Sequence, residues 1–143
     1  MKIMAVDFGD SRTGLACCDK TEFLASPLGI IEEKNFAKVA EKIAHAVMEY
    51  DAKMIVVGLP RNMDGSEGAR AEKCRKLAKW LTNMLPEIPV EMWDERSTTV
   101  TAASILSDNA VYGKKRKEVL DAVAAQVILE SFLAYRRNQQ KQD

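Results

Sequence analysis

The chain has few of the side chains on which most enzyme nucleophiles and zinc sites depend. Among its 143 residues there is one histidine, His45, and there are three cysteines, two of which are adjacent at Cys17 and Cys18. His45 falls on the polar side of a predicted helix, whereas Cys74 has helical spacing with apolar residues, so we expect the first at the surface and the second in the core. This composition argues against a Ser-His or Cys-His catalytic pair, a zinc site and a disulfide framework.

Long apolar runs and a net charge are also lacking. The apolar runs are far too short to cross a bilayer, and Met1-Lys2 leads directly into a predicted strand, which leaves no room for a signal peptide. We therefore expect a cytoplasmic protein that does not bind membranes. The formal net charge is zero, but residues 114–143 hold seven Lys or Arg against four Asp or Glu. The run from Lys114 to Lys117 is either a solvated face or a site that neutralises phosphates.

Apolar and turn-forming residues follow one another in a pattern that is typical of an α/β fold. Apolar residues make up 47% of the chain and charged residues 29%, so we expect one globular domain over residues 1–143. Strands are predicted at Ile3–Phe8, from about Thr13, at Glu22–Ile31, at Met54–Gly58 and at Pro89–Trp93. Helices are predicted from Asn35 to about Glu49, at Gly68–Leu85, at Ser97–Leu106 and at Arg116–Arg137, with a loop over residues 107–114.

The order of these elements predicts how the strands pair. Three leading strands joined by short turns are typical of an antiparallel meander, and two later strands that each follow a helix are typical of right-handed parallel crossovers. We expect a mixed five-stranded sheet flanked by helices. Pro27 has no amide hydrogen to give to a strand ladder, so the third strand is expected at an edge or with a bulge.

Four acidic residues lie where a catalytic site of such a sheet would form. Asp7 ends the first strand, Asp94 and Glu95 follow the last, and Asp121 stands among small and apolar residues in the final helix. If the first strand lies between the second and the fourth, Asp7 and the Asp94-Glu95 pair end at one edge, where ligands of α/β sheets usually bind. Carboxylates without His or Cys partners favour Mg²⁺ or Mn²⁺, which can activate water for phosphodiester hydrolysis without a side-chain nucleophile.

Each of these positions also has a simpler interpretation. Asp7 can cap the turn that follows it, and Asp121 can pair with Lys117 one helical turn earlier. Arg96 can hold a scissile phosphate, or it can pair with Asp94 across the end of the strand. On the residues alone, both sets of interpretations stay open.

Several short motifs follow one another over nearly the whole chain. They are Asp7-Phe8-Gly9, Arg12 to Ala16, Gly58-Leu59-Pro60, Asn62 to Gly65, Asp94-Glu95-Arg96 with Thr98-Thr99, and Lys117 with Asp121 and Ala124-Ala125. In this order they resemble the motif series of the YqgF family, also called RuvX. The resemblance implies an RNase H-like fold related to the RuvC Holliday junction resolvases, and a nuclease assigned to maturation of the 5′ end of the small-subunit ribosomal RNA precursor.

The resemblance also implies which residues form the site. It makes Asp7, Asp94, Glu95 and Asp121 the catalytic acids, and we expect Asp7, Glu95 and Asp121 to bind the metal. Nucleic acid is expected to contact Arg12, Arg96, Lys114, Lys115 and Lys117. The resolvase relatives carry an acid after the fourth strand, where this chain has Gly58-Leu59-Pro60. The acidic pair after the fifth strand is expected to replace it.

We therefore expect a Mg²⁺- or Mn²⁺-dependent endonuclease that acts on structured nucleic acid and processes the 5′ end of pre-16S rRNA. The first alternative is a Holliday junction resolvase, which cuts four-way DNA and needs a symmetric dimer. Both a monomer and a homodimer are consistent with the sequence. The second alternative is a non-catalytic nucleic-acid-binding or ribosome-assembly module, in which the acids serve only packing.

Overall fold

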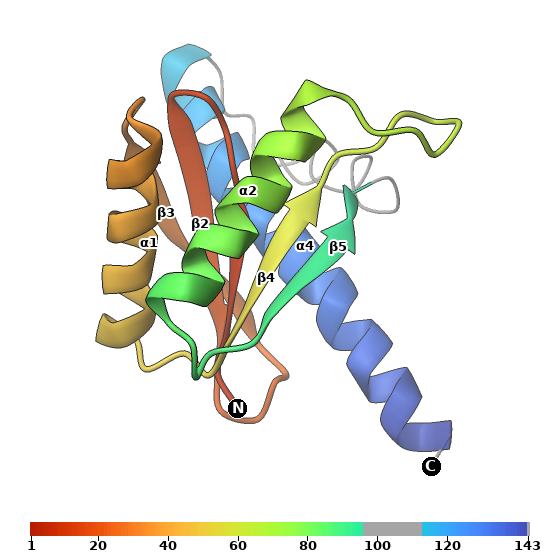
Figure 1. The fold of residues 1–143 in the computed structure, drawn as a ribbon. Helices are drawn as coiled ribbons and strands as arrows, with labels where there is room; N and C mark the ends of the chain where they lie inside the picture. Colours follow the sequence, from red (N-terminus) through yellow and green to blue (C-terminus); the bar gives the residue numbers. More distant parts are fainter. Residues whose placement is uncertain (96–112, 143) are drawn as a thin grey trace.

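A mixed five-stranded sheet forms the centre of the molecule (Figure 1). The computed structural model describes residues 1–95 and 113–142, with side chains up to residue 95 and again from 122 to 140. The strands are β1 (Ile3–Asp7), β2 (Arg12–Cys18), β3 (Ala25–Glu32), β4 (Met54–Leu59) and β5 (Val90–Asp94). The helices are α1 (Phe36–Glu49), α2 (Ala69–Met84) and α4 (Gly113–Gln142). In Figure 1, α1 and α2 cover the near face of the sheet and α4 crosses the far face.

The strands pair as the sequence predicts. Their order is β3-β2-β1-β4-β5. β2 pairs antiparallel with both β1 and β3, and β4 pairs parallel with both β1 and β5. β3 is an edge strand, and its register with β2 shifts between Leu15, opposite Gly29, and Ala16, opposite Pro27. Both expectations drawn from Pro27 are thereby confirmed. Because β1, β4 and β5 run parallel, their carboxyl ends lie together at one end of the sheet, which we call the carboxyl edge.

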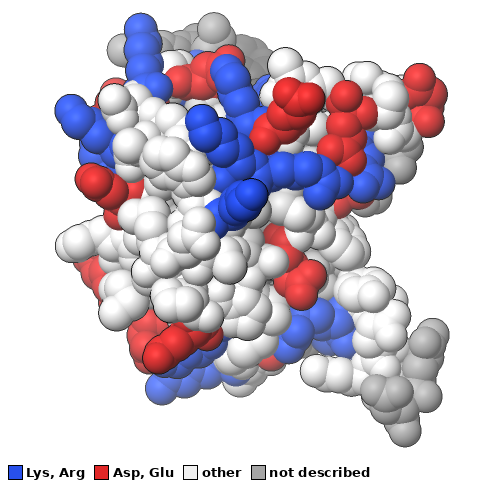
Figure 2. All heavy atoms as spheres, in the orientation of Figure 1, with Lys and Arg blue, Asp and Glu red and all other residues white. Residues whose placement is uncertain are grey.

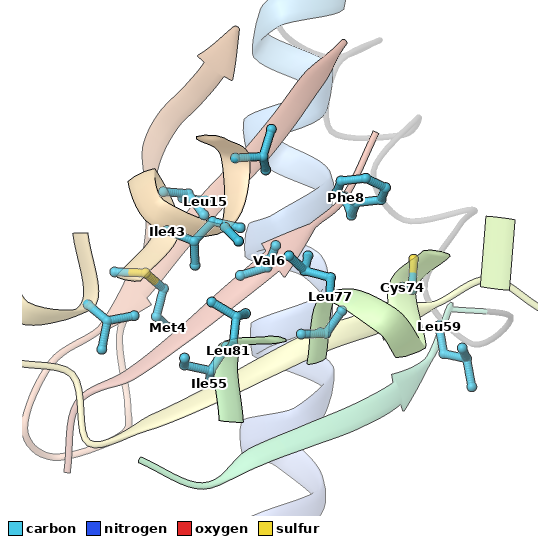
Figure 3. Close-up of a cluster of buried hydrophobic side chains, with 14 of the residues drawn as sticks. Met4, Val6, Phe8, Leu15, Ile43, Ile55, Leu59, Cys74, Leu77 and Leu81 are labelled. Atoms are coloured by element: carbon cyan, nitrogen blue, oxygen red, sulfur yellow. The ribbon is translucent and has the colours of Figure 1, made fainter. Parts of the chain in front are cut away.

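The larger part of the core lies between the sheet and the two helices α1 and α2 (Figure 3). Alternate residues of the strands point into this layer, and α1 and α2 each bury one stripe against them. The labelled side chains are Met4, Val6, Phe8, Leu15, Ile43, Ile55, Leu59, Cys74, Leu77 and Leu81. Asn35 caps α1, because its side-chain oxygen accepts the amide of Lys38 at 3.0 Å. Cys74 is 1% exposed and His45 is exposed, as predicted.

Helix α4 packs on the opposite face of the sheet. Its buried stripe consists of Ala125, Ile128, Leu129, Phe132 and Leu133, which meet Ile3, Ala5, Met54 and Val56 of the sheet. Trp93 of β5 fixes the helix, since its indole Nε1 donates to Ser131 Oγ at 3.1 Å and its ring meets Phe132 edge-on. No helix in the described parts of the chain is long and apolar enough to span a membrane.

The bounds of α4 differ from the prediction. The helix spans Gly113–Gln142, whereas the apolar periodicity predicted 116–137 and assigned residues 113 and 114 to a loop. Lysine, arginine and glutamine flank the apolar stripe at both ends and are good helix formers, so the helix continues past its last buried turn. The helix predicted at 97–106 and the loop residues 107–112 lie outside the described residues.

The turn between β2 and β3 is tied to α4 and to the N-terminus through Glu22. The Glu22 carboxylate accepts from Arg136 Nε at 2.6 Å and Nη2 at 3.2 Å, and from the N-terminal ammonium at 3.1 Å. Its side chain is 18% exposed. Hydrogen bonds from the Arg136 guanidinium hold the pKa of Glu22 below its usual value. This carboxylate therefore joins three segments that are far apart in the sequence.

Replacing Glu22 by glutamine should lower the free energy of unfolding by about 1 to 3 kcal/mol at neutral pH, because a charged hydrogen-bond acceptor is lost. A lowered folded-state pKa stabilises the fold above the unfolded-state pKa of about 4.3, and this stabilisation disappears as pH falls through the folded-state pKa. The difference between wild type and Glu22→Gln should therefore shrink toward about pH 3.

Urea unfolding at the two pH values measures this difference. Glu41→Gln, on the exposed side of α1, is the matched control and should have little effect at either pH. An equal loss at both pH values would show that Glu22 does not act through its charge.

Candidate active site at the carboxyl edge of the sheet

Asp7 lies in the middle of the carboxyl edge, at the end of β1. It is in register with Gly14 of β2 on one side, and the parallel register with β4 places Gly58 on the other side. Ala5 packs against α4, so the side chain of Asp7, two residues later, leaves the sheet on the same face. Neither glycine has a side chain to cover Asp7 from its neighbouring strand. Other side chains can therefore come close to the backbone of these strands beside Asp7.

Glu95 follows β5, and its carboxylate reaches back over the end of β4. A Cβ atom at Gly58 would lie 2.7 Å from Glu95 Oε1 and 2.7 Å from Ile128 Cδ1. The space that a side chain at position 58 would need is thus held by Glu95 and by α4, and only glycine permits this approach. Neighbouring strands are about 4.8 Å apart, and Gly58 is beside Asp7. The carboxylates of Asp7 and Glu95 therefore lie on the same face of the sheet, the first at the end of β1 and the second over the end of the adjoining strand β4.

Asp94 points to the opposite face of the sheet. Trp93 packs against α4, and side chains alternate along a strand, so Asp94 faces α2. Its Oδ2 lies 3.7 Å from Nη1 of Arg61, whose buried Nε lies 3.4 Å from Glu67 as an ion pair without hydrogen-bond geometry. Glu67 also accepts from Nε and Nη2 of Arg75, each at 2.7 Å, and these bonds lower the pKa of Glu67. Asp94 thus orients Arg61 in a network that ties β5 to α2.

The negative charges of Glu95 and Asp7 both act on the buried thiol of Cys74. Burial is the main cause that raises the pKa of Cys74 to about 12, followed by the negative charge of Glu95. Asp7 and Asp10 raise it further, and Arg70 opposes them. Cys74 remains a protonated core residue near neutral pH, which agrees with the prediction that it is not a nucleophile.

The backbone of α4 brings Asp121 toward the same edge. Asp121 lies seven residues before Ile128, whose side chain touches the space beside Gly58. The distance along the axis is about 10 Å, in the direction of the strand carboxyl ends in Figure 1. The side chain of Asp121 lies outside the described set. Among the side chains that are described, no three Asp, Glu, His or Cys residues gather as metal ligands.

Basic side chains flank Asp7 at this edge. Arg12 begins β2, which runs antiparallel to β1, so it stands beside the carboxyl end of β1. Arg70 Nη2 donates to the carbonyl oxygen of Phe8 at 3.0 Å, and Lys73 pairs with Asp10 at 3.1 Å. Of the other predicted nucleic-acid contacts, Arg96 and the side chains of Lys114, Lys115 and Lys117 lie outside the described set.

Sequence reasoning missed three of the basic residues near the site. Arg61 follows β4 directly, and Arg70 and Lys73 open α2 at a spacing of three residues, which places them on one side of the helix. Their position after a strand and at a helix start, next to the motif glycines, is the signal that could have identified them.

The chain also matches a known family. The family described as "RuvX: Holliday junction resolvase" matches residues 1–135. This chain belongs to the RuvX family. A RuvX-family relative from Halothermothrix orenii is 43% identical over 135 residues, which cover 94% of this chain and 96% of the relative. Another, from Pelotomaculum thermopropionicum, is 42% identical over 134 residues, with 93% and 86% covered. Both relatives carry the name "Putative pre-16S rRNA nuclease".

Solved structures show that the RuvX-family fold is shared with resolvases. RuvC of Thermus thermophilus, solved with a Holliday junction substrate, has a TM-score of 0.62 at 12% identity and covers 95% of this chain and 96% of its own. The fowlpox virus resolvase with Holliday junction DNA has a TM-score of 0.60 at 12% identity, with 94% and 98% covered. The predicted RNase H-like fold and the predicted family are confirmed.

The geometry ranks three glycine substitutions by their cost to stability. Gly9→Ala should lower the free energy of unfolding by about 1 to 3 kcal/mol, because the new Cβ would collide with the backbone carbonyl oxygen of Arg12. Gly58→Ala would meet side-chain atoms of Glu95 and Ile128 rather than backbone, so it should cost less while displacing the Glu95 carboxylate. Gly68→Ala has no neighbour within 4 Å, so it should cost only the preference for glycine over alanine at the N-cap of α2, about 0.5 to 1 kcal/mol.

Urea unfolding of the three variants measures this order. If Gly58→Ala cost as much as Gly9→Ala, Glu95 would not be able to yield, and the close approach would be rigid.

Proposed function

We propose that this chain is a divalent-metal-dependent endonuclease of structured nucleic acid, with the 5′ region of pre-16S rRNA as its substrate. The observation that carries the proposal is the Glu95 carboxylate over Gly58, beside Asp7 and on the face that α4 covers. Membership of the RuvX family and the names of its relatives support phosphodiester cleavage.

The donor atoms at this edge fit a hard cation. Asp7 and Glu95 supply carboxylate oxygens, and the absence of a Cβ at Gly58 lets the Glu95 carboxylate lie over β4, beside Asp7. Oxygen-only ligand sets of this kind suit Mg²⁺ or Mn²⁺. We assign Asp7, Glu95 and Asp121 as the residues that would hold the metal. When bound, such ions supply an activated water and stabilise charge on the phosphate and the leaving oxygen.

The protein's own residues then bind and orient the substrate. The absence of a Cβ at Gly58 lets the Glu95 carboxylate and α4 lie close to β4, so that Glu95 stands beside Asp7 where a phosphodiester would bind. Arg12 stands beside Asp7, and Arg61, held by Asp94 and Glu67 on the α2 face of the same edge, is placed to bind a phosphate farther along the strand. Asp94 acts as a positioning residue in this proposal, since it holds the Arg61 guanidinium at the end of β5.

The location of Glu95 supports the expectation that the acidic pair replaces the acid of the resolvase relatives after the fourth strand. The carboxylate of Glu95 occupies the place where a side chain at position 58 would begin. The acid therefore comes from the neighbouring strand, β5, and Glu95 is the member of the pair that reaches the site.

Cleavage of four-way DNA is a second candidate, favoured by the structural similarity to RuvC and to the fowlpox resolvase. It requires a symmetric dimer that cuts two strands, whereas trimming of RNA at a single site does not. A non-catalytic binding module is the third candidate, and it predicts no response to metal.

Asp7→Asn should reduce cleavage by about 100-fold or more while leaving the fold intact, because a neutral amide weakens metal binding and relieves repulsion between carboxylates. Mg²⁺ or Mn²⁺ should raise the melting temperature of the wild type, through binding to the native state, and raise that of Asp7→Asn less. Precursor rRNA and four-way DNA junctions are offered in parallel assays. Wild-type turnover by a folded Asp7→Asn variant would refute the metal site.

Glu95→Gln and Gly58→Ala should both lower kcat, since the first neutralises the carboxylate and the second moves it while every charge remains. Asp94→Asn should chiefly raise KM, because it loosens the Arg61 guanidinium. Gly68→Ala is the matched control for Gly58→Ala and should cleave as wild type does. Cleavage by Gly58→Ala at the wild-type rate would contradict the assignment of Glu95.

A further inference from the structure

The exposed surface of α2 is strongly basic. Its buried stripe of Ala71, Cys74, Leu77 and Leu81 faces the core, and its solvent side carries Arg70, Lys73, Arg75, Lys76 and Lys79 against the single acid Glu72. The other helix on this face, α1, is balanced, with two lysines and two glutamates. Figure 2 shows Lys and Arg side chains gathered over the region that α2 occupies in Figure 1. Asp10 and Glu67 pair with Lys73 and Arg75, so part of this charge is offset. The positive charge that remains on α2 attracts polyanions.

This basic surface begins at the candidate active site. Arg70, at the start of α2, donates to the carbonyl oxygen of Phe8, the residue after Asp7. Lys73 and Lys76 follow at intervals of three residues, so the three side chains are neighbours on the helix and step about 4.5 Å along its axis. The positive end of the helix dipole lies at the same end. Positive charge therefore runs from the edge of the sheet along the outside of α2.

The charge of Lys76 is held in place without being neutralised. Its ammonium lies 4.7 Å from the centre of the Phe36 ring and 5.6 Å from that of Trp80. Phe36 in turn meets Phe8 and Trp80 edge-on, at 5.8 and 4.9 Å between ring centres. Arg75 and Lys73 differ, because Glu67 pairs with the first at 2.7 Å and Asp10 with the second at 3.1 Å. Aromatic contacts leave the full positive charge of Lys76 available to a phosphate.

We propose that Arg70, Lys73, Lys76 and Lys79, which we call the α2 basic face, bind the sugar-phosphate backbone of the nucleic acid beside the scissile bond. The proposal rests on the proposed nuclease function. From Arg70 to Lys79 the helix rises about 13 Å, and each step of three residues also turns the row by about 60° around the axis, so the row crosses the exposed side of α2 diagonally. Because a duplex carries one charge per about 1.7 Å, a backbone that follows this diagonal meets several phosphates. Contacts of this kind position the strand and do not read its sequence.

The test is the salt dependence of binding by the full chain, without added divalent metal so that the nucleic acid stays intact. Lys76→Gln/Lys79→Gln should flatten the slope of log affinity against log salt by about 1 to 2, because each lost phosphate contact removes about 0.9. Lys20→Gln/Lys53→Gln is the matched control, since both lysines are exposed at the opposite end of the strands. The control pair should keep the wild-type slope.

Three outcomes would overturn the proposal. An unchanged slope in Lys76→Gln/Lys79→Gln shows that the α2 basic face is only solvated, and an equal change in both pairs shows a general effect of net charge. Failure of the wild type to bind either precursor rRNA or four-way DNA refutes the nuclease function and the α2 basic face together. Melting temperatures of all variants show whether a variant has lost stability. The single variant Lys79→Gln keeps the contacts of Lys76 with Phe36 and Trp80, so it tests the loss of charge without the loss of that packing.

Discussion

The close approach of the Glu95 carboxylate to the backbone of β4 is the contact on which the candidate site depends. It requires glycine at position 58, because a Cβ there would meet both Glu95 and Ile128. It also requires α4 to lie flat on that face, which the buried stripe and the bond from Trp93 to Ser131 secure. The packing of Ile128 against β4 and the position of the Glu95 carboxylate thus both depend on the absence of a side chain at Gly58, so a substitution there affects both.

The sheet also separates two kinds of charge. On the α4 face stand carboxylates that a hard cation would join, whereas on the α2 face Asp94 belongs to a network that runs through Arg61 and Glu67 to Arg75. Because side chains alternate along an extended strand, Asp94 and Glu95 point to opposite faces of the sheet and have different neighbours. The α2 helix continues the cationic side of this arrangement away from the edge, where a long polyanion would extend beyond the cleaved bond.

Much of the fold was predictable, because apolar residues recur with a different period in strands than in helices. Pro27 indicated the irregular edge strand, and the position of Asp7 at the end of the first strand identified the middle of the edge. The resemblance favoured Glu95 over Asp94 as a metal ligand, but the residues alone did not distinguish them, since the difference depends on which carboxylate can reach Gly58 in three dimensions. The charge of α2 was visible in the sequence, but its closeness to Asp7 arises only when α2 docks on the end of β1.

Anomalous scattering from crystals grown with Mn²⁺ tests the metal site most directly, because it locates the ion without relying on activity. We expect manganese at the carboxyl edge, on the α4 face, within coordination distance of oxygens from Asp7 and Glu95, about 2.0 to 2.6 Å. Asp121 should supply a further ligand. Manganese held by Asp94 on the α2 face, or no manganese at this edge at saturating concentration, would contradict the proposed mechanism.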